Sequence, residues 1–274
     1  MTSSLRISFA GAGNAAFRLS IALKSAGFEV PFIWGRNEKS GVQLASILNK
    51  HEYNPLSLSD TAYASDISEL NESDVIILAV SDDAIKEVFS KISLIPSVVS
   101  GKTVVCHTSG ATSISAVSSV PSYGVFYPLM TLSKAKPVDM KIVPFLLEVS
   151  DENSRSVLVN MTESLGSEYM ICNSDERMRM HVAAVFVSNF VNYMAALAYD
   201  VSVPHHVFLL PLAIETVRKA FLYGHPSLVQ TGPAVRGDIS TIEKHLDILE
   251  DTPEHRQVYE LLSKLIASRA QTKK

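Results

Sequence analysis

The residues Gly11-Ala12-Gly13-Asn14-Ala15-Ala16 have the types and spacing of a loop that binds a diphosphate. Gly11 permits a tight turn, Gly13 lets the backbone approach the ligand, and Ala16 keeps the following helix close to the preceding strand. The first turn of that helix then directs unpaired N–H groups and the positive end of its dipole at the anion. Glycines also serve ordinary turns, but here the match follows an apolar run and opens a helical pattern, which is typical of a dinucleotide site. The residues expected to contact a dinucleotide are Gly11, Ala12, Gly13, Asn14 and Ala15.

The end of the second apolar run indicates which dinucleotide is bound. An NAD site usually has Asp or Glu there, to bind the 2′-hydroxyl of the adenosine ribose. This chain has Trp34-Gly35-Arg36-Asn37-Glu38-Lys39-Ser40, with no acid at the expected position. Arg36 has the charge and shape to pair with a 2′-phosphate, and Asn37, Lys39 or Ser40 can add donors, so NADP is favoured over NAD. The alternative is that Arg36 is an ordinary solvated surface residue.

Two further strand ends are expected at the same crevice, because ligands of open α/β sheets bind outside the carboxyl ends of the strands. After one of them, the backbone of Ala79, Val80 and Ser81 is expected to touch the cofactor, while the Ser81 side chain caps the next helix. After the other, His107 and Ser109 are candidates for binding a carbonyl or carboxylate beside the nicotinamide, with simple turn chemistry as the alternative. A serine-hydrolase elbow is excluded because it requires Gly where His107 stands.

Polar residues in the second half of the chain supply the remaining candidates. His181 opens an uncharged helical stretch, and Ser188 and Asn192 fall within about 20° of it on a helical wheel. His181 is a candidate for proton transfer or substrate binding, and Asn189 for orienting the substrate, although a lone histidine on such a helix is more often a satisfied core residue. A later polar turn contains Thr231, Arg236 and Asp238, which either clamp the turn or reach a substrate anion.

The elements that position these residues fall into two groups. Residues 1–172 alternate short apolar runs with amphipathic stretches, the pattern of βαβ units around a parallel sheet. The run Val75–Val80 has no alternation, as expected for a central strand covered on both faces. The expected strands are Leu5–Ala10, Val30–Trp34, Val75–Val80, Thr103–Cys106, Tyr123–Tyr127, Phe145–Val149 and Glu168–Ile171.

Residues 173–274 show long helical patterns without a strand signal, at about Asp175–Tyr199, Pro204–Tyr223, Ile239–Leu249 and Pro253–Ala270. The sequence therefore predicts an α/β fold, in which a doubly wound, mostly parallel Rossmann sheet in residues 1–172 is followed by an all-α domain in residues 173–274. The second domain is expected to help bind the substrate.

Composition limits the partners and the compartment. The net charge is −4 and no Lys/Arg-rich stripe occurs, so neither nucleic acid nor anionic lipid is an expected partner, and a small molecule fits better. The 2 cysteines and the lack of a secretory signal pattern indicate the cytoplasm. A mean hydropathy of +0.18 favours a subunit interface and hence an oligomer. The uncharged stretch Val182–Tyr199 approaches membrane-spanning length, but its central polar residues favour a helix buried inside protein. No metal-ligand spacing is present.

With these residues in view, the chain resembles a family of oxidoreductases in which a Rossmann-like N-terminal domain precedes a helical C-terminal domain of unknown function. The resemblance covers nearly the whole chain. Many relatives have His-Pro where this chain has Tyr127-Pro128, which removes any role of that histidine or passes it to the tyrosine hydroxyl. Related hydroxyacid reductases have a lysine where this chain has Val185. The resemblance rests on Gly11–Asn14, His107–Gly110, Tyr127–Leu129, His181–Ala184, Ser188-Asn189, Thr231–Pro233 and Arg236–Asp238.

The family is similar in architecture to pyrroline-5-carboxylate reductase, ketopantoate reductase and deazaflavin-dependent NADP oxidoreductases. Their helical domains, of the 6-phosphogluconate dehydrogenase C-terminal type, commonly dimerise. The resemblance implies an NADP-dependent enzyme that transfers a hydride between nicotinamide and a small carbonyl, imine or deazaflavin-type substrate. In this hypothesis His107, Ser109 and Asn189 orient the substrate and His181 supplies a proton. The alternative is a non-catalytic NAD(P)-binding sensor or scaffold.

Overall fold

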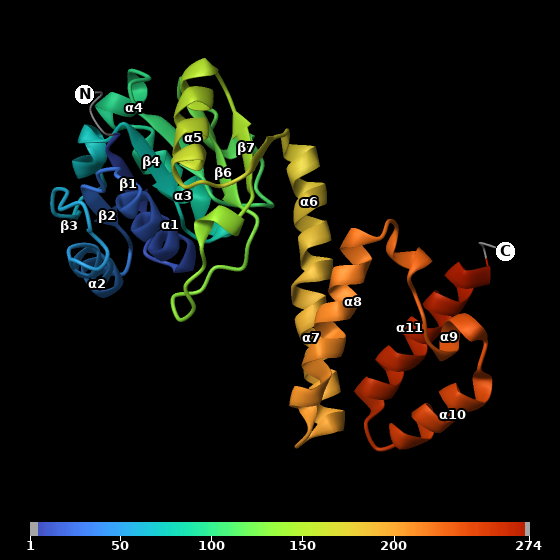
Figure 1. Cartoon of the computed structure of the whole chain (residues 1–274). Helices are drawn as coiled ribbons and strands as arrows, with labels where there is room; N and C mark the ends of the chain where they lie inside the picture. The colour runs from blue at the N-terminus through green and yellow to red at the C-terminus, as the bar shows by residue number, and fades with distance from the viewer. Residues whose placement is uncertain (1–4, 272–274) are drawn as a thin grey trace. The chain divides into compact units, whose positions relative to one another are not determined.

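The computed structural model describes residues 5–271 (Figure 1). Contacts divide the chain after Ser188 into two compact units. The boundary expected after residue 172 lies between the last strand and helix α6 (Ser174–Val187), and contacts group α6 with the sheet. The position of the functional domain boundary stays a prediction.

The first unit is built on an eight-stranded sheet with the order β3-β2-β1-β4-β5-β6-β7-β8. All neighbouring strands are parallel except β6 and β7, which are antiparallel. The predicted α/β fold with a mostly parallel sheet is therefore confirmed, and so is the central place of the Val75–Val80 run. The strands are β1 (Ile7–Ala10), β2 (Phe32–Trp34), β3 (Ala62–Tyr63), β4 (Val75–Leu78), β5 (Val104–His107), β6 (Tyr123–Pro128), β7 (Phe145–Val149) and β8 (Tyr169–Ile171).

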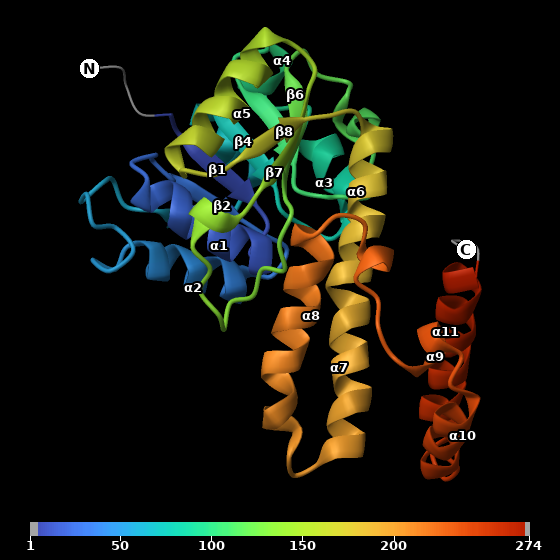
Figure 2. The same ribbon diagram turned by 45° about the vertical axis from the view of Figure 1, so that its right-hand side comes forward.

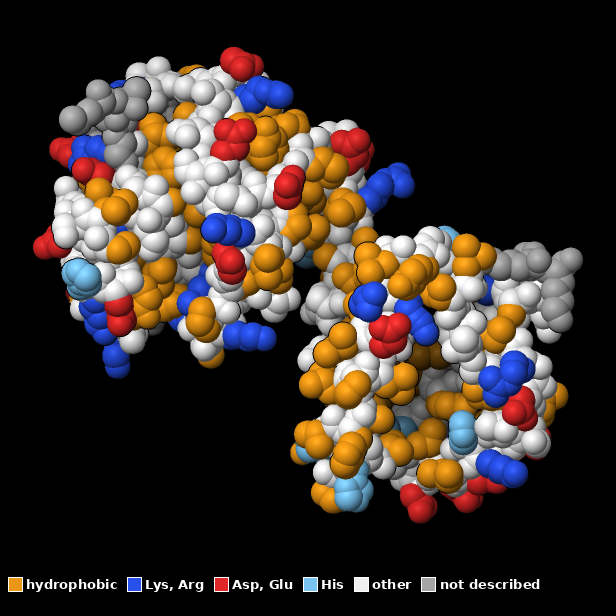
Figure 3. All heavy atoms as spheres, in the orientation of Figure 1, with side chains coloured by type: hydrophobic (Ala, Val, Ile, Leu, Met, Phe, Trp, Pro, Cys, Tyr) orange, Lys and Arg blue, Asp and Glu red, His pale blue; other side chains and the backbone are white. Residues whose placement is uncertain are grey.

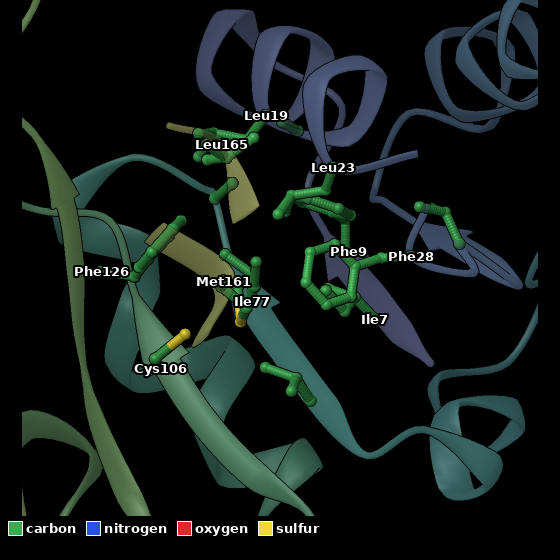
Figure 4. Close-up of a cluster of buried hydrophobic side chains, with 14 of the residues drawn as sticks. Ile7, Phe9, Leu19, Leu23, Phe28, Ile77, Cys106, Phe126, Met161 and Leu165 are labelled. Atoms are coloured by element: carbon green, nitrogen blue, oxygen red, sulfur yellow. The ribbon is translucent and has the colours of Figure 1, made fainter. Parts of the chain in front are cut away.

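Alternate residues of the central strands enter two separate hydrophobic cores, because successive side chains of a strand point to opposite faces. On one face Ile7 and Phe9 of β1 and Ile77 of β4 pack with Leu19 and Leu23 of helix α1 (Figure 4). On the other face, residues of β4 and β5 pack against helix α3 (Ile85–Ile92). The helices of the first unit are α1 (Asn14–Ser25), α2 (Glu38–Leu48), α3, α4 (Pro96–Val99), α5 (Glu152–Ser164) and α6, and its 3₁₀ helices are η1 (Ile67–Glu72), η2 (Asp82–Ala84), η3 (Ile114–Val117) and η4 (Met140–Ile142).

The second unit is helical, and its described part, residues 189–271, contains no strand. Helices α7 and α8 run next to each other (Figures 1 and 2), and α9 contacts both α10 and α11. The all-α prediction for this part of the chain is thus confirmed. Its helices are α7 (Asn189–Ser202), η5 (His206–Leu209), α8 (Leu210–Leu222), η6 (Pro226–Leu228), α9 (Pro233–Arg236), α10 (Ile239–Ile248) and α11 (Pro253–Gln271).

The second unit has almost no core of its own. Among the described residues, helices α7, α8, α10 and α11 contain no buried side chain. The helical stretch Ser174–Ser202 is long and apolar enough to cross a membrane by length and composition, and its most apolar window is not buried. The expectation that this stretch is buried inside protein is therefore not met by the described residues of the single chain.

Candidate functional site

A pocket of about 460 Å³ opens at the carboxyl ends of β1, β2 and β4. The residues expected to contact the cofactor line this pocket, together with Gly35 and the candidate donor Ser40, whereas the other candidate donor, Lys39, does not line it. The fold thus brings three separate sequence segments to one place, although their contact with a ligand stays a prediction. The lining residues are Gly11, Ala12, Gly13, Asn14, Ala15, Gly35, Arg36, Asn37, Ser40, Ala79, Val80 and Ser81.

Gly11 and Gly13 of the first loop differ in what would surround an added Cβ atom. Gly11 has φ +129°, and a Cβ at this position would stand 2.3 Å from the carbonyl oxygen of Ala79. The protein itself therefore requires glycine at position 11. Gly13 has φ −78°, and a Cβ there would meet only the Ala79 oxygen, at 4.0 Å. The open space above Gly13 leaves room for a ligand to approach the backbone.

The start of α1 has the properties of an anion site. Gly13 is the N-cap residue, no described side chain caps the helix with a hydrogen bond, and the first turn contains no acid. Its N–H groups are therefore available, together with the positive end of the helix dipole, to a diphosphate in the pocket. The donor set fits the dinucleotide that the sequence predicts.

The opposite part of the pocket contains a positive side chain, Arg36, that could pair with a 2′-phosphate. The Arg36 side chain is 61% exposed, and its Nη1 lies 3.8 Å from a carboxylate oxygen of Glu87. Asn37 caps α2 by accepting a hydrogen bond from the Ser40 N–H, at 2.9 Å. None of the described lining residues is acidic, and the only carboxylate paired with Arg36 among the described residues is that of Glu87, so a 2′-phosphate would replace it as the partner of the guanidinium.

A loop that the sequence analysis missed lies beside the glycine turn. Lys134 donates through Nζ to the carbonyl oxygen of Ala12, at 2.8 Å, and its backbone N–H donates to Oδ1 of Asn14, at 3.3 Å. Arg18 holds this loop by donating to the carbonyl oxygens of Ser133 and Lys134. The Lys134 ammonium is thereby placed next to the proposed diphosphate site. No motif signals such a contact, because it joins residues 122 positions apart.

Ser81 differs from its expected role in helix capping. It occupies the N-cap position of η2, which precedes α3, but its side chain makes no capping hydrogen bond within the described residues. The expectation that its hydroxyl caps the helix is therefore wrong. Its place on the pocket wall is consistent with the predicted contact between its backbone and the cofactor.

His107 ends β5 and is fully buried. Its Nδ1 accepts a hydrogen bond from the Ser109 N–H at 3.2 Å, so the ring proton of the neutral form is on Nε2. That Nε2 makes no hydrogen bond of good geometry within the described residues. Burial, and secondarily the charge of Arg177, lowers the pKa of His107 to about 4, although the backbone of Ser113 is near enough to offset part of this lowering. His107 is therefore neutral at physiological pH and is not a proton donor there.

Ser109 organises the turn that follows. Its Oγ accepts hydrogen bonds from the backbone N–H groups of Ala111, at 3.2 Å, and Thr112, at 2.9 Å, and it donates to Oγ1 of Thr112 at 3.0 Å. These bonds are those of the turn alternative considered for this segment. Direct contact of His107 or Ser109 with a substrate stays a prediction.

His181 on α6 meets residues from two neighbouring strand ends. Its Nδ1 lies 2.9 Å from the hydroxyl oxygen of Tyr127, the residue before the end of β6. The two rings are at 68°, with centroids 5.8 Å apart. Gly110, in the turn after β5, lies against both rings. Burial, followed by the negative charge of Asp82, raises the pKa of the Tyr127 hydroxyl, so this group is protonated at neutral pH.

A buried ion pair fixes α6 one turn before His181. Arg177 is 1% exposed and pairs through Nη1 with the Glu148 carboxylate of β7, while its Nη2 donates to the carbonyl oxygen of Thr112. Ser174 donates to the same carboxylate at 2.9 Å. Since Arg177 and His181 are four residues apart, they share one face of α6. The ion pair therefore holds His181 against the strand ends.

The remaining predicted site residues belong to the second unit. Asn189 is the first residue of α7, directly after Ser188, which ends the first unit. Arg236 lies 3.9 Å from the carboxylate of Asp238, which caps α10 through the N–H and hydroxyl of Thr241. These contacts are those of the clamp alternative. Thr231 is exposed, and the contact of Thr231, Arg236, Asp238 or Asn189 with a substrate stays a prediction. Within residues 5–271, no group of three or more His, Cys, Asp or Glu side chains could hold a metal ion.

Comparisons with known proteins agree with this architecture. Residues 143–266 match a domain of unknown function, DUF2520, and a search of curated proteins finds no match. A Thermotoga maritima protein is 22% identical over 97% of this chain and 99% of its own, with a TM-score of 0.66. A reductive aminase from Aspergillus terreus, solved with NADPH, is 13% identical over 99% of this chain and 95% of its own, with a TM-score of 0.70. At these identities, the two structures support the fold alone.

A Bacteroides fragilis protein described as a "putative NADP oxidoreductase" is more similar. It is 33% identical, covers 97% of this chain and 98% of its own, and superposes with a TM-score of 0.81. This identity extends over both the sheet and the helical part. The protein therefore belongs to the oxidoreductase family of that Bacteroides protein, in which a Rossmann-type sheet is joined to a DUF2520 domain.

Proposed function

We propose that the protein is an NADP-dependent oxidoreductase that transfers a hydride between nicotinamide and a small carbonyl, imine or deazaflavin-type substrate. The observation that carries this proposal is the pocket at the start of α1, where the helix N-terminus, the space above Gly13 and the guanidinium of Arg36 occur together. When bound, the nicotinamide supplies the hydride chemistry, and the protein supplies orientation and proton transfer.

Each part of the pocket has a role in this proposal. The N–H groups at the start of α1 bind the diphosphate, and Arg36 binds the 2′-phosphate. The backbone of Ala79–Ser81 contacts the nicotinamide half, and His181 exchanges a proton with the substrate. His107 and Ser109 keep the neighbouring turn in place and orient the substrate, with Asn189, Thr231, Arg236 and Asp238 as further substrate contacts.

Proteins with this fold suggest the first substrates to test. The similar structures include imine reductases from Myxococcus stipitatus and Streptomyces aurantiacus and a Plasmodium falciparum pyrroline carboxylate reductase solved with NADP. Reduction of a C=N or C=O bond requires a hydride from one side and a proton for the heteroatom. The pocket and His181 offer the groups needed for both.

The test has two stages. Binding of NADPH and of NADH is first measured by the increase in nicotinamide fluorescence, and we expect NADPH to bind more tightly. Oxidation of NADPH is then followed by absorbance with a panel of cyclic imines, 2-ketoacids and deazaflavins. Absence of binding at millimolar concentration would refute the proposed function. Tight binding with no oxidation by any acceptor would instead support the sensor or scaffold.

We also propose that the functional form is a homodimer joined through the helical domain. The second unit has large exposed apolar side chains, including Phe208 (78%), Leu212 (66%) and Phe221 (68%). It also has an open apolar pocket of about 470 Å³ lined mainly by residues of α7, α10 and α11, and a hollow among the helices of this unit is visible in Figure 3. A second copy of the chain would cover this surface and complete the missing core.

Sedimentation velocity tests the dimer. We expect a dimer for the native chain and dissociation or precipitation for Leu212→Glu. Leu94→Glu, at a position of the first unit that is 77% exposed against 66% for Leu212, should leave the dimer intact. A monomer at micromolar concentration would contradict the proposal.

We further propose a cytoplasmic enzyme without nucleic-acid or membrane partners, supported by the net charge of −4. Flotation of the protein with anionic vesicles would contradict this.

A further inference from the structure

Tyr127 lies where its hydroxyl group can fix the orientation of the His181 ring, and the proposed function assigns it no role. The hydroxyl oxygen of Tyr127 lies 2.9 Å from Nδ1 of His181, which is within ordinary hydrogen-bond range. Both side chains are partly exposed, so the pair lies at the edge of the first unit and is not part of its core. The pair is formed by α6 and the end of β6, next to the turn after β5.

The fold keeps space for this pair. A Cβ at Gly110 would stand 2.6 Å from Nδ1 of His181 and 2.7 Å from Cζ of Tyr127. Real Cβ contacts are essentially never this short, so any residue other than glycine would separate the two rings. Gly110 does not have a positive φ, and it is therefore the close approach of the rings, rather than a left-handed backbone, that requires glycine here.

A hydrogen bond at one ring nitrogen decides what the other can do. A histidine ring that is free to flip offers either nitrogen to a substrate and exists as two neutral tautomers. A partner fixed at Nδ1 selects one ring orientation and leaves Nε2 for proton exchange. A tyrosine hydroxyl can donate to Nδ1 or accept from it, and it must accept when His181 is an imidazolium, because both ring nitrogens then carry hydrogen. The charged or titratable groups around the pair are Asp82 beside Tyr127, Arg177 with Glu148 one turn earlier on α6, and the neutral, buried His107.

We propose that Tyr127 is a positioning residue whose hydroxyl oxygen accepts a hydrogen bond from Nδ1–H of His181, so that Nε2 is the atom that exchanges a proton with the substrate. This inference rests on the proposed function and deepens it. In the reduction, the hydride from reduced nicotinamide forms the new C–H bond, and the electron pair of the C=O or C=N π bond moves to the heteroatom. That heteroatom takes the Nε2 proton of the His181 imidazolium. His181 is left as the neutral Nδ1–H tautomer that Tyr127 holds, and oxidation runs the same transfers in reverse.

The buried ion pair completes this arrangement. Arg177 joins α6 to Glu148 of β7 and to the turn carbonyl of Thr112, so the helix backbone is fixed on two sides. Tyr127 then fixes the remaining freedom, which is rotation of the His181 ring. The backbone and the ring are thus fixed by separate groups, as a proton donor with a defined direction requires.

The first test needs neither cofactor nor substrate. Nitrogen-15 NMR of the histidine rings, with the His181 signals assigned from His181→Ala, distinguishes the two neutral tautomers at about pH 8. We expect a predominant Nδ1–H tautomer in the native protein and a shift toward Nε2–H in Tyr127→Phe. Tyr123→Phe is the matched control, because it removes a hydroxyl from the same face of β6 four residues earlier, and it should leave the His181 signals unchanged. An Nε2–H tautomer in the native protein, or no change in Tyr127→Phe, would overturn the proposal.

The second test uses turnover of the best acceptor found among the imines and ketoacids. Removing a general acid typically costs about 10²–10⁴-fold, so His181→Ala should lower kcat by at least ~100-fold. Tyr127→Phe should lower kcat by about tenfold, with KM and the NADPH dissociation constant within about twofold, and should alter the loss of rate at alkaline pH. Because the two residues act as one unit, the double variant should be no slower than His181→Ala alone.

The outcomes separate this inference from the proposed function. Independent, multiplying losses in the double variant would show that Tyr127 does not act through His181 and would overturn the positioning role. Gly110→Ala is expected to reproduce the loss of Tyr127→Phe while NADPH still binds. If the native protein oxidises no NADPH, the proposed function fails, yet the NMR result still decides whether Tyr127 fixes the His181 ring.

Discussion

The substitution Gly13→Ala separates ligand binding from folding more cleanly than any other change in the pocket. Gly13 has a φ of −78° that any residue can adopt, and an added Cβ would contact only the Ala79 oxygen at 4.0 Å. Alanine is a poorer N-cap than glycine by about 1 kcal/mol. It recovers about 0.4–1 kcal/mol by restricting the unfolded chain. We therefore expect the free energy of unfolding to change by less than about 1 kcal/mol.

The effect on NADPH should be much larger. The added methyl group occupies the space through which a diphosphate would approach the N–H groups at the start of α1. Loss of one hydrogen bond to a charged group costs about 1.5–3 kcal/mol, which corresponds to a dissociation constant raised about 10- to 150-fold. Nicotinamide fluorescence gives the dissociation constant, and urea unfolding gives the stability of the same sample.

Gly11→Ala is the matched comparison at the neighbouring glycine. Its φ of +129° and a Cβ 2.3 Å from the Ala79 oxygen combine backbone strain with overlap. Each effect costs about 1–3 kcal/mol, so Gly11→Ala should destabilise the fold where Gly13→Ala does not. A stable Gly13→Ala protein that binds NADPH with native affinity would refute the assignment of the diphosphate to this loop.

Three further predictions concern residues of the first unit. In fluorescence titrations, Arg36→Ala should weaken NADPH binding about tenfold or more and leave NADH binding unchanged. The control is Lys91→Ala, which removes another cation paired with Glu87 but outside the pocket, and it should change the binding of neither cofactor. The pKa of His107 is lowered from 6.5 to about 4 in the folded protein. Between these two pH values the unfolded chain therefore binds more protons than the folded protein does. The free energy of unfolding should accordingly fall by about 3 kcal/mol as the pH drops from 6.5 to 4. Urea unfolding of His107→Asn should lack this part of the pH dependence, and an unchanged slope would contradict it. Glu148→Ala leaves the buried Arg177 without its partner and should cost about 3–5 kcal/mol in thermal or urea unfolding, while the double variant with Arg177→Met should recover most of this loss.

The fold could be predicted from the sequence because its signals are local. The uninterrupted apolar run of β4 indicates a strand buried on both faces, and the glycine loop after β1 indicates the start of a helix. Each expected strand is present, and only β3 was missed, since its two residues, Ala62 and Tyr63, are too few to show periodicity. The antiparallel direction of β7 was not predicted, because strand direction depends on the path of the connecting segment.

The pocket was predictable for a related reason. In a parallel sheet, the residues that follow each strand lie at one edge, so strand ends far apart in sequence are brought together by topology alone. Contacts made by irregular segments have no such rule. Lys134 reaches Ala12 from a loop without a motif, and the pair of Tyr127 and His181 forms only because Arg177 fixes α6 against the sheet.

Three glycines show most clearly where sequence reasoning stops. Gly11, Gly13 and Gly110 all follow apolar strands. The sequence assigns a tight turn to Gly11 and ligand approach to Gly13, and it gives no reason for Gly110. The structure gives each a different neighbour for the missing Cβ, namely a backbone carbonyl, open pocket space, and a pair of aromatic side chains. Gly11 is therefore required by the fold, Gly13 is left open for a ligand, and Gly110 is required by the Tyr127–His181 pair. Because the three reasons predict loss of stability, loss of NADPH affinity and loss of turnover respectively, alanine at each position should produce three different defects from one chemical change.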